Sequence, residues 1–300
     1  MTRKVLAIFY SQSGQLEEII DQFTAPMRES GIELEKVRVR TKINYPLPWT
    51  GTSFFSVMPD CVLGTVTALE HFEPRSASYD LIIFGYQAWF LSPSLPANAI
   101  LHHPSLQHIF KGTPVVTITG ARNMWISAME RIKPTLREKG AQLVGNIALV
   151  DKHLNLVSFV TIFHWMFSGK RDRYLNIFPK PGVGEDDIAG SRVFGNTVTR
   201  YLLEGSGWDG MQAALVSQKA VVIKYNLMFI ESKARRIFAV WAGIISKKKK
   251  KTAWLVAFKY YLLIALFIAA PIILTVDAIL FKPFLSARIK RQKQYYSGVN

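Results

Sequence analysis

The stretch Val5-Leu-Ala-Ile-Phe-Tyr-Ser-Gln-Ser-Gly-Gln-Leu16 sets the beginning of the fold. Its first half, Val5 to Tyr10, is a continuous apolar run of the kind found in strands that are buried on both faces. Residues Ser11 to Gln15 are polar and small, and from Leu16 to Phe23 apolar side chains recur at helical spacing. The stretch therefore predicts a strand, a tight polar loop and a helix.

The same alternation of strands and helices continues along the next two hundred residues or so of the chain. Strands alternating with helices predict an α/β fold with a doubly wound, five-stranded parallel sheet. The apolar run from His153 to Phe167 does not fit the alternation. It is interpreted as an extra packed helix, a wall of a substrate channel or a membrane-surface element. Further strands are predicted at 32–39 (near an edge), 81–85, 113–119 and 142–150, helices at 96–110, 126–139 and 186–203, and a Pro- and aromatic-rich connection at 44–59.

The net charge of +16 is concentrated at one end of the 300-residue chain. From Lys233 onwards, fourteen basic side chains accompany one acidic side chain, Asp277, so this part carries +13 and the remainder +3. The lysine run Lys247 to Lys251 adjoins Tyr260 to Val276, which is uncharged over 17 residues. Basic residues beside such a stretch indicate contact with anionic lipid, and we expect no nucleic-acid partner.

The apolar stretch is long enough to be a membrane segment. Both of its flanks are basic, so the distribution of charge does not orient a single span. Pro271 lies near its middle, which leaves two alternatives: one kinked crossing, or a hairpin that returns to the same face, which we slightly favour. Upstream, an apolar stripe indicates either an interfacial amphipathic helix or a helix packed on the body. The stripe consists of Ile237, Phe238, Trp241, Ile244 and Ile245.

These patterns divide the chain into three parts. Residues 1–205 form the α/β domain, with 153–182 as an insertion; residues 206–252 form a helical basic connector, and residues 253–300 form the membrane segment with a basic tail. The N-terminus lacks the pattern of a signal peptide, because its apolar run is too short. We therefore expect the body on the cytoplasmic face of the inner membrane, anchored by the C-terminal segment.

Three loops leave the carboxyl ends of the predicted strands, where doubly wound sheets bind their ligands. The first, Ser11 to Leu16, offers hydroxyls, a glycine and helix N-terminal amides, which suit an anion. The second, Tyr86 to Ser94, combines flat rings with small polar residues, and the third is Gly120 to Trp125. We expect the three loops to form one ligand site.

The combination of fold and loops resembles the flavodoxin-like superfamily. Ser11, Ser13 and Gly14 match its FMN-phosphate motif, although Leu16 stands in place of the final Thr and two glutamates follow. The resemblance implies that FMN is the cofactor. It places the flavin ring between the second and third loops, with Trp89 and either Tyr86 or Phe90 stacking and Arg122 and Asn123 near the pyrimidine. The implied cofactor-binding set is Ser11, Gln12, Ser13, Gly14, Gln15, Leu16, Tyr86, Gln87, Ala88, Trp89, Phe90, Gly120, Ala121, Arg122 and Asn123.

A narrower resemblance covers nearly the whole chain. The segments YSQSGQL, YQAWFLSPS, TGARNMW, GNIALVDKH and IFPKPG, with the pair Pro48-Trp49, are similar to bacterial dialkylresorcinol-condensing enzymes of resorcinol-lipid and aryl polyene biosynthesis. The implied substrate is a lipid-like polyketide, and the implied partners are anionic lipids and other enzymes of the same pathway, with a homodimer as a further expectation. Condensation requires an activated cysteine, whereas Cys61 lies in a predicted loop without a partner. The flavin site favours ring oxidation (aromatisation).

Two other functions remain open at this point: an NAD(P)H-dependent quinone or flavin reductase, and a flavin-free membrane scaffold. Arg122 and His164 are the candidate catalytic residues, with His164 interpreted as a core histidine or as a proton donor to substrate. His102, His103 and His108 lack the accompanying ligands of a metal site, and we expect no metal. The letters GxGxxG at Gly205 to Gly210 follow a predicted helix instead of a strand, so they do not indicate a dinucleotide site.

Overall fold

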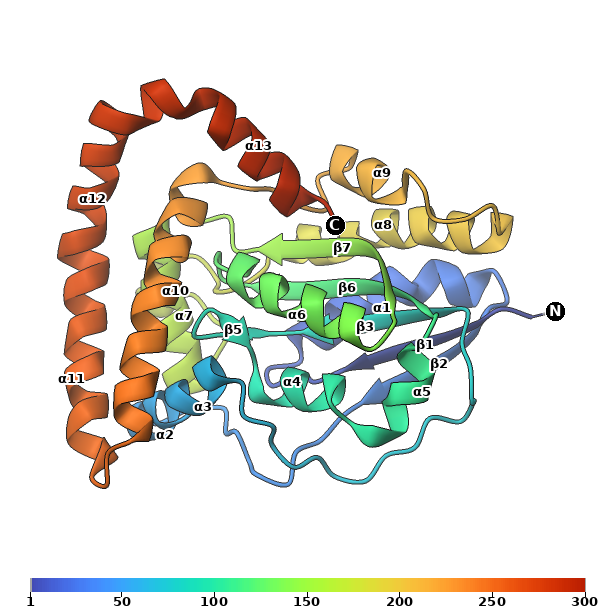
Figure 1. Ribbon diagram of the computed structural model, residues 1–300, viewed down its shortest axis with the longest axis horizontal. Helices are drawn as coiled ribbons and strands as arrows, with labels where there is room; N and C mark the ends of the chain where they lie inside the picture. The colour runs from blue at the N-terminus through green and yellow to red at the C-terminus, as the bar shows by residue number, and fades with distance from the viewer. Residues whose placement is uncertain (1, 300) are drawn as a thin grey trace.

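A computed structural model describes residues 2–299 and contains one sheet of five parallel strands in the order β2-β1-β3-β6-β7 (Figure 1). This is the flavodoxin-like strand order, in which the chain reverses its direction of winding between β1 and β3. The predicted fold class is confirmed. The strands are β1 (Lys4–Phe9), β2 (Glu33–Arg38), β3 (Leu81–Tyr86), β6 (Pro114–Ala121) and β7 (Gln142–Val150).

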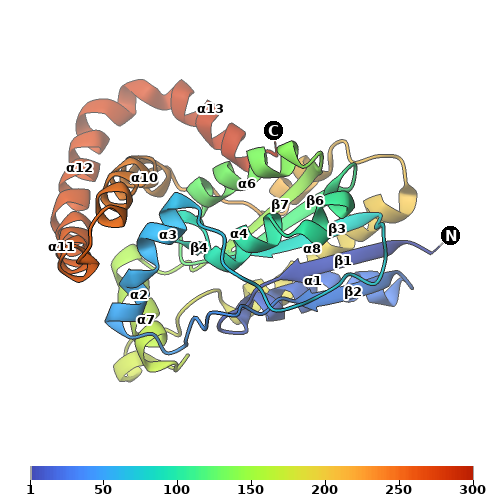
Figure 2. The same ribbon diagram turned by 60° about the horizontal axis from the view of Figure 1, so that its bottom comes forward.

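Helices cover both faces of the sheet, which explains the continuous apolar strands. One face is buried beneath α1, α8 and α9, and the opposite face beneath α4, α5 and α6 (Figures 1 and 2). The helices are α1 (Gln15–Glu29), α8 (Glu185–Glu204) and α9 (Met211–Ser217) on the first face, and α4 (Leu95–Leu101), α5 (Gln107–Phe110) and α6 (Ile126–Glu138) on the second.

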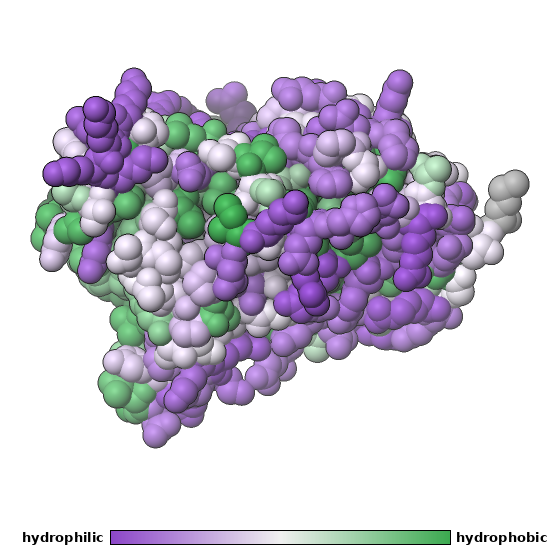
Figure 3. All heavy atoms as spheres, turned by 90° about the horizontal axis from the view of Figure 1, so that it is seen from below, coloured by the Kyte–Doolittle hydropathy of each residue, from purple (hydrophilic) through white to green (hydrophobic). Residues whose placement is uncertain are grey.

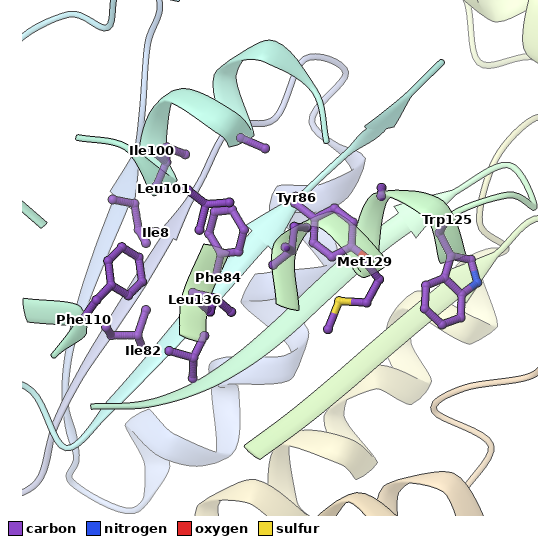
Figure 4. Close-up of a cluster of buried hydrophobic side chains, with 14 of the residues drawn as sticks. Ile8, Ile82, Phe84, Tyr86, Ile100, Leu101, Phe110, Trp125, Met129 and Leu136 are labelled. Atoms are coloured by element: carbon purple, nitrogen blue, oxygen red, sulfur yellow. The ribbon is translucent and has the colours of Figure 1, made fainter. Parts of the chain in front are cut away.

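The core alternates along each strand. Ile82, Phe84 and Tyr86 of β3 point toward α4 and α6, as Figure 4 shows, whereas Leu81 and Ile83 pack on the α1 side. All five side chains are fully buried. Burying an apolar side chain of this size contributes about 1.5–3 kcal/mol to the free energy of unfolding. The buried side chains of the central strands therefore stabilise the sheet independently of the loops.

Two predicted segments were wrong in detail. The connection at 44–59 contains helix α2 (Gly51–Ser56), whose first turn is closed by reciprocal hydrogen bonds between Thr50 and Ser53, and α3 (Met58–Leu63) follows directly. Cys61 therefore lies in a helix and is buried, instead of in a loop. The helix predicted at 96–110 is broken after α4 by a short 3-10 turn, Pro104–Leu106, because Pro104 cannot donate a backbone hydrogen bond.

A C-terminal arm of helices runs along the carboxyl side of the sheet (Figure 1). The chain stays helical through Pro271, after a π-helical turn at Ala265–Ala269, and changes direction only at the 3-10 turn Lys282–Leu285. The predicted hairpin at Pro271 is therefore not formed, since a π turn accommodates a proline ring without reversing the chain. The arm consists of α10 (Tyr225–Ser246), α11 (Lys251–Ile264), α12 (Ala270–Val276) and α13 (Ser286–Ser297).

The predicted apolar stripe on α10 is packed against the body and against α11. Phe238 and Ile245 are buried with Phe258 of α11, and Phe258 in turn contacts Phe55 of α2. Ile237 stays 40% exposed on the outside. Of the two alternatives for this helix, the structure shows the packed one.

Helices α1 and α8 lie so close together that a Cβ at Gly195 would sit 1.9 Å from the carbonyl oxygen of Phe23. We expect Gly195→Ala to lower the free energy of unfolding by at least about 2 kcal/mol, because the two backbones must separate. Gly190→Ala, in the same helix with nothing within 4 Å, should be neutral or stabilising by up to about 1 kcal/mol. Thermal unfolding of both variants measures the difference; equal midpoints would contradict this packing.

Glu231 of α10 is buried, and one of its carboxylate oxygens accepts a hydrogen bond from the backbone N–H of Ser127 at 2.6 Å. Burial raises the pKa of this carboxyl group from 4.5 to about 7. Between these values the folded protein keeps a proton that the unfolded chain releases, so stability should fall by about 3 kcal/mol as pH rises from 4.5 to 7.

We therefore expect Glu231→Gln to remove this fall and to raise the melting temperature at pH 8 relative to the unsubstituted protein. Glu138→Gln, at an exposed site at the end of α6, serves as the matched control and should leave the pH dependence unchanged. Melting temperatures of the two variants and of the unsubstituted protein, measured between pH 4.5 and pH 8, test this expectation. An unchanged slope in Glu231→Gln would show that another group is responsible.

Candidate functional site

A cavity of about 250 Å3 lies at the carboxyl ends of β1, β3 and β6, beneath helix α7 (Asn155–Ser168). This is the position at which doubly wound sheets bind ligands. All three predicted loops reach it. Their lining residues are Gln12, Ser13, Gln15 and Leu16 from the first loop, Gln87, Ala88, Trp89 and Phe90 from the second, and Gly120, Ala121 and Arg122 from the third.

The first loop presents the N-terminus of α1 to the cavity. Gly14 precedes the helix with a φ of 88°, a conformation that favours glycine, and it has no side chain of its own to cap the helix. The first two amides of the helix, those of Gln15 and Leu16, together with the helix dipole make an anion site. Ser13 lines the cavity, whereas Ser11 is buried and its hydroxyl accepts a hydrogen bond from the backbone N–H of Glu17 at 3.4 Å.

The sequence departs from the phosphate motif at Leu16 and at the two glutamates that follow it, Glu17 and Glu18. Neither glutamate leaves an unpaired negative charge at the cavity. The side chain of Leu16 is buried in the core, so this position contributes its backbone to the loop. Glu17 forms ion pairs with Lys36 at 3.2 Å and with Arg38 at 2.6 Å. Glu18 lies 3.6 Å from Arg171.

Two glutamines fasten the first loop to other segments. The side-chain amide of Gln15 donates to the carbonyl of Val183 at 3.1 Å, and its oxygen accepts from the Val183 N–H at 3.0 Å. Gln12 donates to the carbonyls of Tyr45 and Pro46 at 3.0 and 3.1 Å. Both side chains therefore brace the loop, and the amide nitrogen of each is already hydrogen-bonded.

Aromatic rings form one side of the cavity. Trp89 meets Tyr45 and Trp49 edge to face, with centroids 5.4 and 5.7 Å apart. Phe90 has a φ of 48°, which is costly for a bulky residue, and its ring lies 4.8 Å from that of Phe54. The loop is thus held in an uncommon conformation by its packing, and it presents flat rings to the cavity.

Arg122 supplies a buried positive charge. Its guanidinium donates to the backbone carbonyl and side-chain oxygen of Asn155 at 3.1 and 3.2 Å and lies over the Phe159 ring at 5.8 Å. Burial lowers the pKa of Arg122 to about 10, and nearby Asp151 acts in the opposite direction. The group stays charged at neutral pH. Asn123 also bonds to Asn155, at 2.5 Å, and does not line the cavity.

Gln87 leaves a polar atom without a partner at the cavity. Its side-chain oxygen is buried and accepts no hydrogen bond within the described residues. A buried amide oxygen in this state costs about 1–3 kcal/mol unless a ligand donates to it. Gln87 and Arg122 together are suited to a ligand that carries both N–H and carbonyl groups.

Five predicted residues do not line the cavity: Ser11, Gly14 and Asn123, which were described above, and Tyr86 and His164. Tyr86 is fully buried in the core, with its ring 6.2 Å from that of Phe84, so it does not stack on a ligand (Figure 4). His164 faces away from the cavity, where its imidazole pairs with Asp172 at 2.6 Å and lies 4.6 Å from the ring of Tyr174. Its position gives no support to proton transfer to a bound ligand.

Sequence reasoning missed most of the apolar wall. Two features of the sequence point to this wall. One is the apolar run at 153–167, for which the sequence allows three interpretations, and the other is the Pro48-Trp49 pair. The structure shows that α7 forms a wall of the cavity. Position 182 favours glycine, because its φ is 85° and a Cβ there would lie 2.8 Å from the Trp165 ring. The missed residues are Leu47, Trp49, Phe54, Val57, Ile162, Phe163, Trp165, Met166 and Gly182.

No protein-family model matches the chain, and no curated protein matches its sequence. Among solved structures, a flavoprotein from Lactobacillus acidophilus in complex with FMN is similar at 15% identity over 49% of this chain and 93% of that one, with a TM-score of 0.40. Oxidised flavodoxin 1 from Bacillus cereus is similar at 17% identity over 68% of this chain and 99% of that one, with a TM-score of 0.35.

A third structure, a flavone reductase, is similar at 10% identity over 69% of this chain and 65% of that one, with a TM-score of 0.39. The strand order β2-β1-β3-β6-β7 by itself identifies the fold. The chain has the α/β flavodoxin-like fold, with a helical C-terminal arm and with α7 covering the carboxyl end of its sheet.

Proposed function

We propose that this protein is an FMN-dependent oxidoreductase. The observation that carries the proposal is the convergence of a helix N-terminus, a ring-bearing loop and a buried arginine on one cavity at the carboxyl end of the sheet. The α1 amides and Ser13 would hold the phosphate. Trp89 and Phe90 would flank the ring, and Gln87 and Arg122 would face its polar edge.

The residues present fit this cofactor. The pyrimidine end of a flavin carries an N–H group, which suits the unpartnered oxygen of Gln87, and carbonyl groups, which suit the guanidinium of Arg122. A positive charge near the ring favours reduced, anionic flavin. When bound, FMN supplies an acceptor for two electrons and two protons.

For the substrate we propose an alkylated cyclohexanedione-type polyketide, which is oxidised to a dialkylresorcinol. The apolar side chains of α7, including Ile162, Phe163 and Met166, give the cavity a wall that suits an alkylated ring. Aromatisation removes two electrons and two protons from the ring, which equals the capacity of one flavin. The resemblance of the sequence to enzymes of dialkylresorcinol biosynthesis supports this choice.

The surroundings of Cys61 argue against condensation as the reaction. The thiol lies 3.2 Å from the carbonyl oxygen of Trp89 and 3.3 Å from that of Pro93. Burial raises its pKa well above the usual range, so the reactive thiolate is disfavoured. An acyl-transfer nucleophile requires the opposite environment.

The membrane association proposed for the body rests on the C-terminal arm. Within residues 2–299, one helical stretch, Lys251–Ser297, is long and apolar enough to cross a membrane by length and composition. A bilayer would also dissolve an alkylated ring. We therefore propose that the enzyme works at the cytoplasmic face of the inner membrane.

Purified protein should show a flavin absorbance band that dithionite bleaches. Ser13→Ala should weaken FMN binding about tenfold to hundredfold, because a hydrogen bond to a charged phosphate is lost. Ser217→Ala removes a similar hydroxyl far from the cavity and should bind FMN normally. Titration of the apoprotein with FMN, followed by fluorescence, measures both variants. Colourless protein that ignores added FMN would reject the proposal and favour a flavin-free scaffold.

Under anaerobic conditions, a dialkylated cyclohexane-1,3-dione should bleach the bound flavin and yield one resorcinol per flavin. Mass spectrometry should find a product lighter than the substrate by two hydrogens. Arg122→Gln should slow the bleaching without unfolding the protein, whereas Arg200→Gln, on the exposed side of α8, should not. Rapid NAD(P)H oxidation with a quinone, and no reaction with the dione, would identify a quinone reductase instead.

A further inference from the structure

The outer side of the long arm helix is apolar along most of its length, and Lys259 is an exposed charge within α11. Its helical residues 251–281 extend for about 45 Å at 1.5 Å per residue. Only 6% of its most apolar window is buried in the molecule. Figure 3 looks along this helix from its Lys251 end, and hydrophobic residues there lie at the left edge beside a strongly hydrophilic cluster. The exposed apolar side chains are Trp254, Val256, Tyr260, Ile264, Phe267, Ile268, Ile272, Ile273, Val276, Ile279, Leu280, Phe281 and Phe284.

Both ends of this helix are fastened to the same globular body. At the first end, Phe258 packs between Phe55 and Phe238, with ring centroids 6.2 and 5.2 Å away. Beyond the second end, α13 returns to the body. There Tyr295 donates to Glu130 of α6 at 3.0 Å, and the side chain of Gln212 in α9 donates to the carbonyl of Ser297 at 2.7 Å.

This attachment excludes a crossing in the observed conformation. A spanning helix places its two ends on opposite sides of the bilayer, whereas here both ends contact elements of one sheet domain. The contact between Phe267 and Phe159 of α7, with centroids 5.3 Å apart, also holds the middle of the helix against the body. The exposed face can therefore enter lipid only sideways.

Four cations lie one helix layer behind that face. Lys233, Arg235 and Arg236 of α10 and Arg288 of α13 line a cavity of about 360 Å3. None of them forms an ion pair with a carboxylate in the described part of the chain. Packed helices are about 8–10 Å apart, and an interfacial helix sinks about 5–10 Å into the boundary, so these cations would reach the headgroup level.

We infer that the protein lies flat on an anionic bilayer. The outer face of α11 and α12 rests parallel to the membrane surface among the first acyl carbons, and the cavity between α10 and α13 takes the phosphate of an anionic lipid. The lysine run at 247–251 and the basic residues of α13 border the two ends of the apolar stretch. This mode of attachment does not depend on the reaction or on the flavin.

Depth measurements test the orientation. Ile264→Cys, Ile272→Cys and Ile279→Cys, each on the exposed face, are spin-labelled in the full-length protein; the native Cys61 is buried and should not label. In vesicles of phosphatidylcholine and phosphatidylglycerol, the three labels should lie at the same shallow depth. A label at Ile272 that is much deeper than both others would show a crossing and overturn the inference.

Vesicle flotation tests the lipid phosphate site. Arg235→Gln combined with Arg236→Gln should reduce binding to the phosphatidylglycerol vesicles about tenfold or more, since each basic residue near such a surface contributes about 1 kcal/mol. Lys42→Gln combined with Arg200→Gln removes the same charge outside the arm and should change binding by less than about threefold. Equal losses in the two double variants, or equal binding to pure phosphatidylcholine, would overturn this assignment. Flavin content, measured in parallel, reports separately on the proposed function.

Discussion

Because all five strands are parallel, each connection between them must cross a face of the sheet before the next strand begins. This constraint brings the loops after β1, β3 and β6 to one edge, although they are separated by many residues in the sequence. The cavity exists because these loops meet there. The turns that lead into the strands lie at the opposite edge of the sheet. The side chains that line the cavity lie at the carboxyl edge.

The cavity is closed by contacts that hold the first loop to later parts of the chain. The paired hydrogen bonds between Gln15 and Val183 join the start of α1 to the segment that leads into α8. Arg171 also donates to the Val183 carbonyl, at 2.8 Å, and lies over the ring of Trp165 in α7. These groups place an apolar helix above a polar anion cradle. A site built in this way suits a ligand with a charged end and a flat ring, next to an apolar second molecule.

The fold was predictable because its signals are local. Continuous apolar runs identify β1 and β3, and their alternation with amphipathic helices identifies the sheet type. Ser13, Trp89 and Arg122 were found at the site because loops at strand ends must lie there. The failures arose from contacts that the pattern does not contain. Tyr86 was expected in the loop after β3 but is the last residue of that strand, and its side chain points into the core because side chains alternate between the two faces of a strand. His164 and Trp165 are adjacent on α7, and the helical rotation between them decides that only Trp165 reaches the cavity.

The sequence by itself determined the class of fold, the three loops of the site and the separation of a near-neutral body from a basic, apolar end. These depend on periodicity and composition, which short segments express on their own. Only the tertiary structure decided that Pro271 does not reverse the chain, that α7 covers the cavity and that both ends of the long apolar helix are fastened to one body. Those features depend on contacts such as Tyr295 with Glu130, which join residues 165 positions apart and which no local pattern specifies.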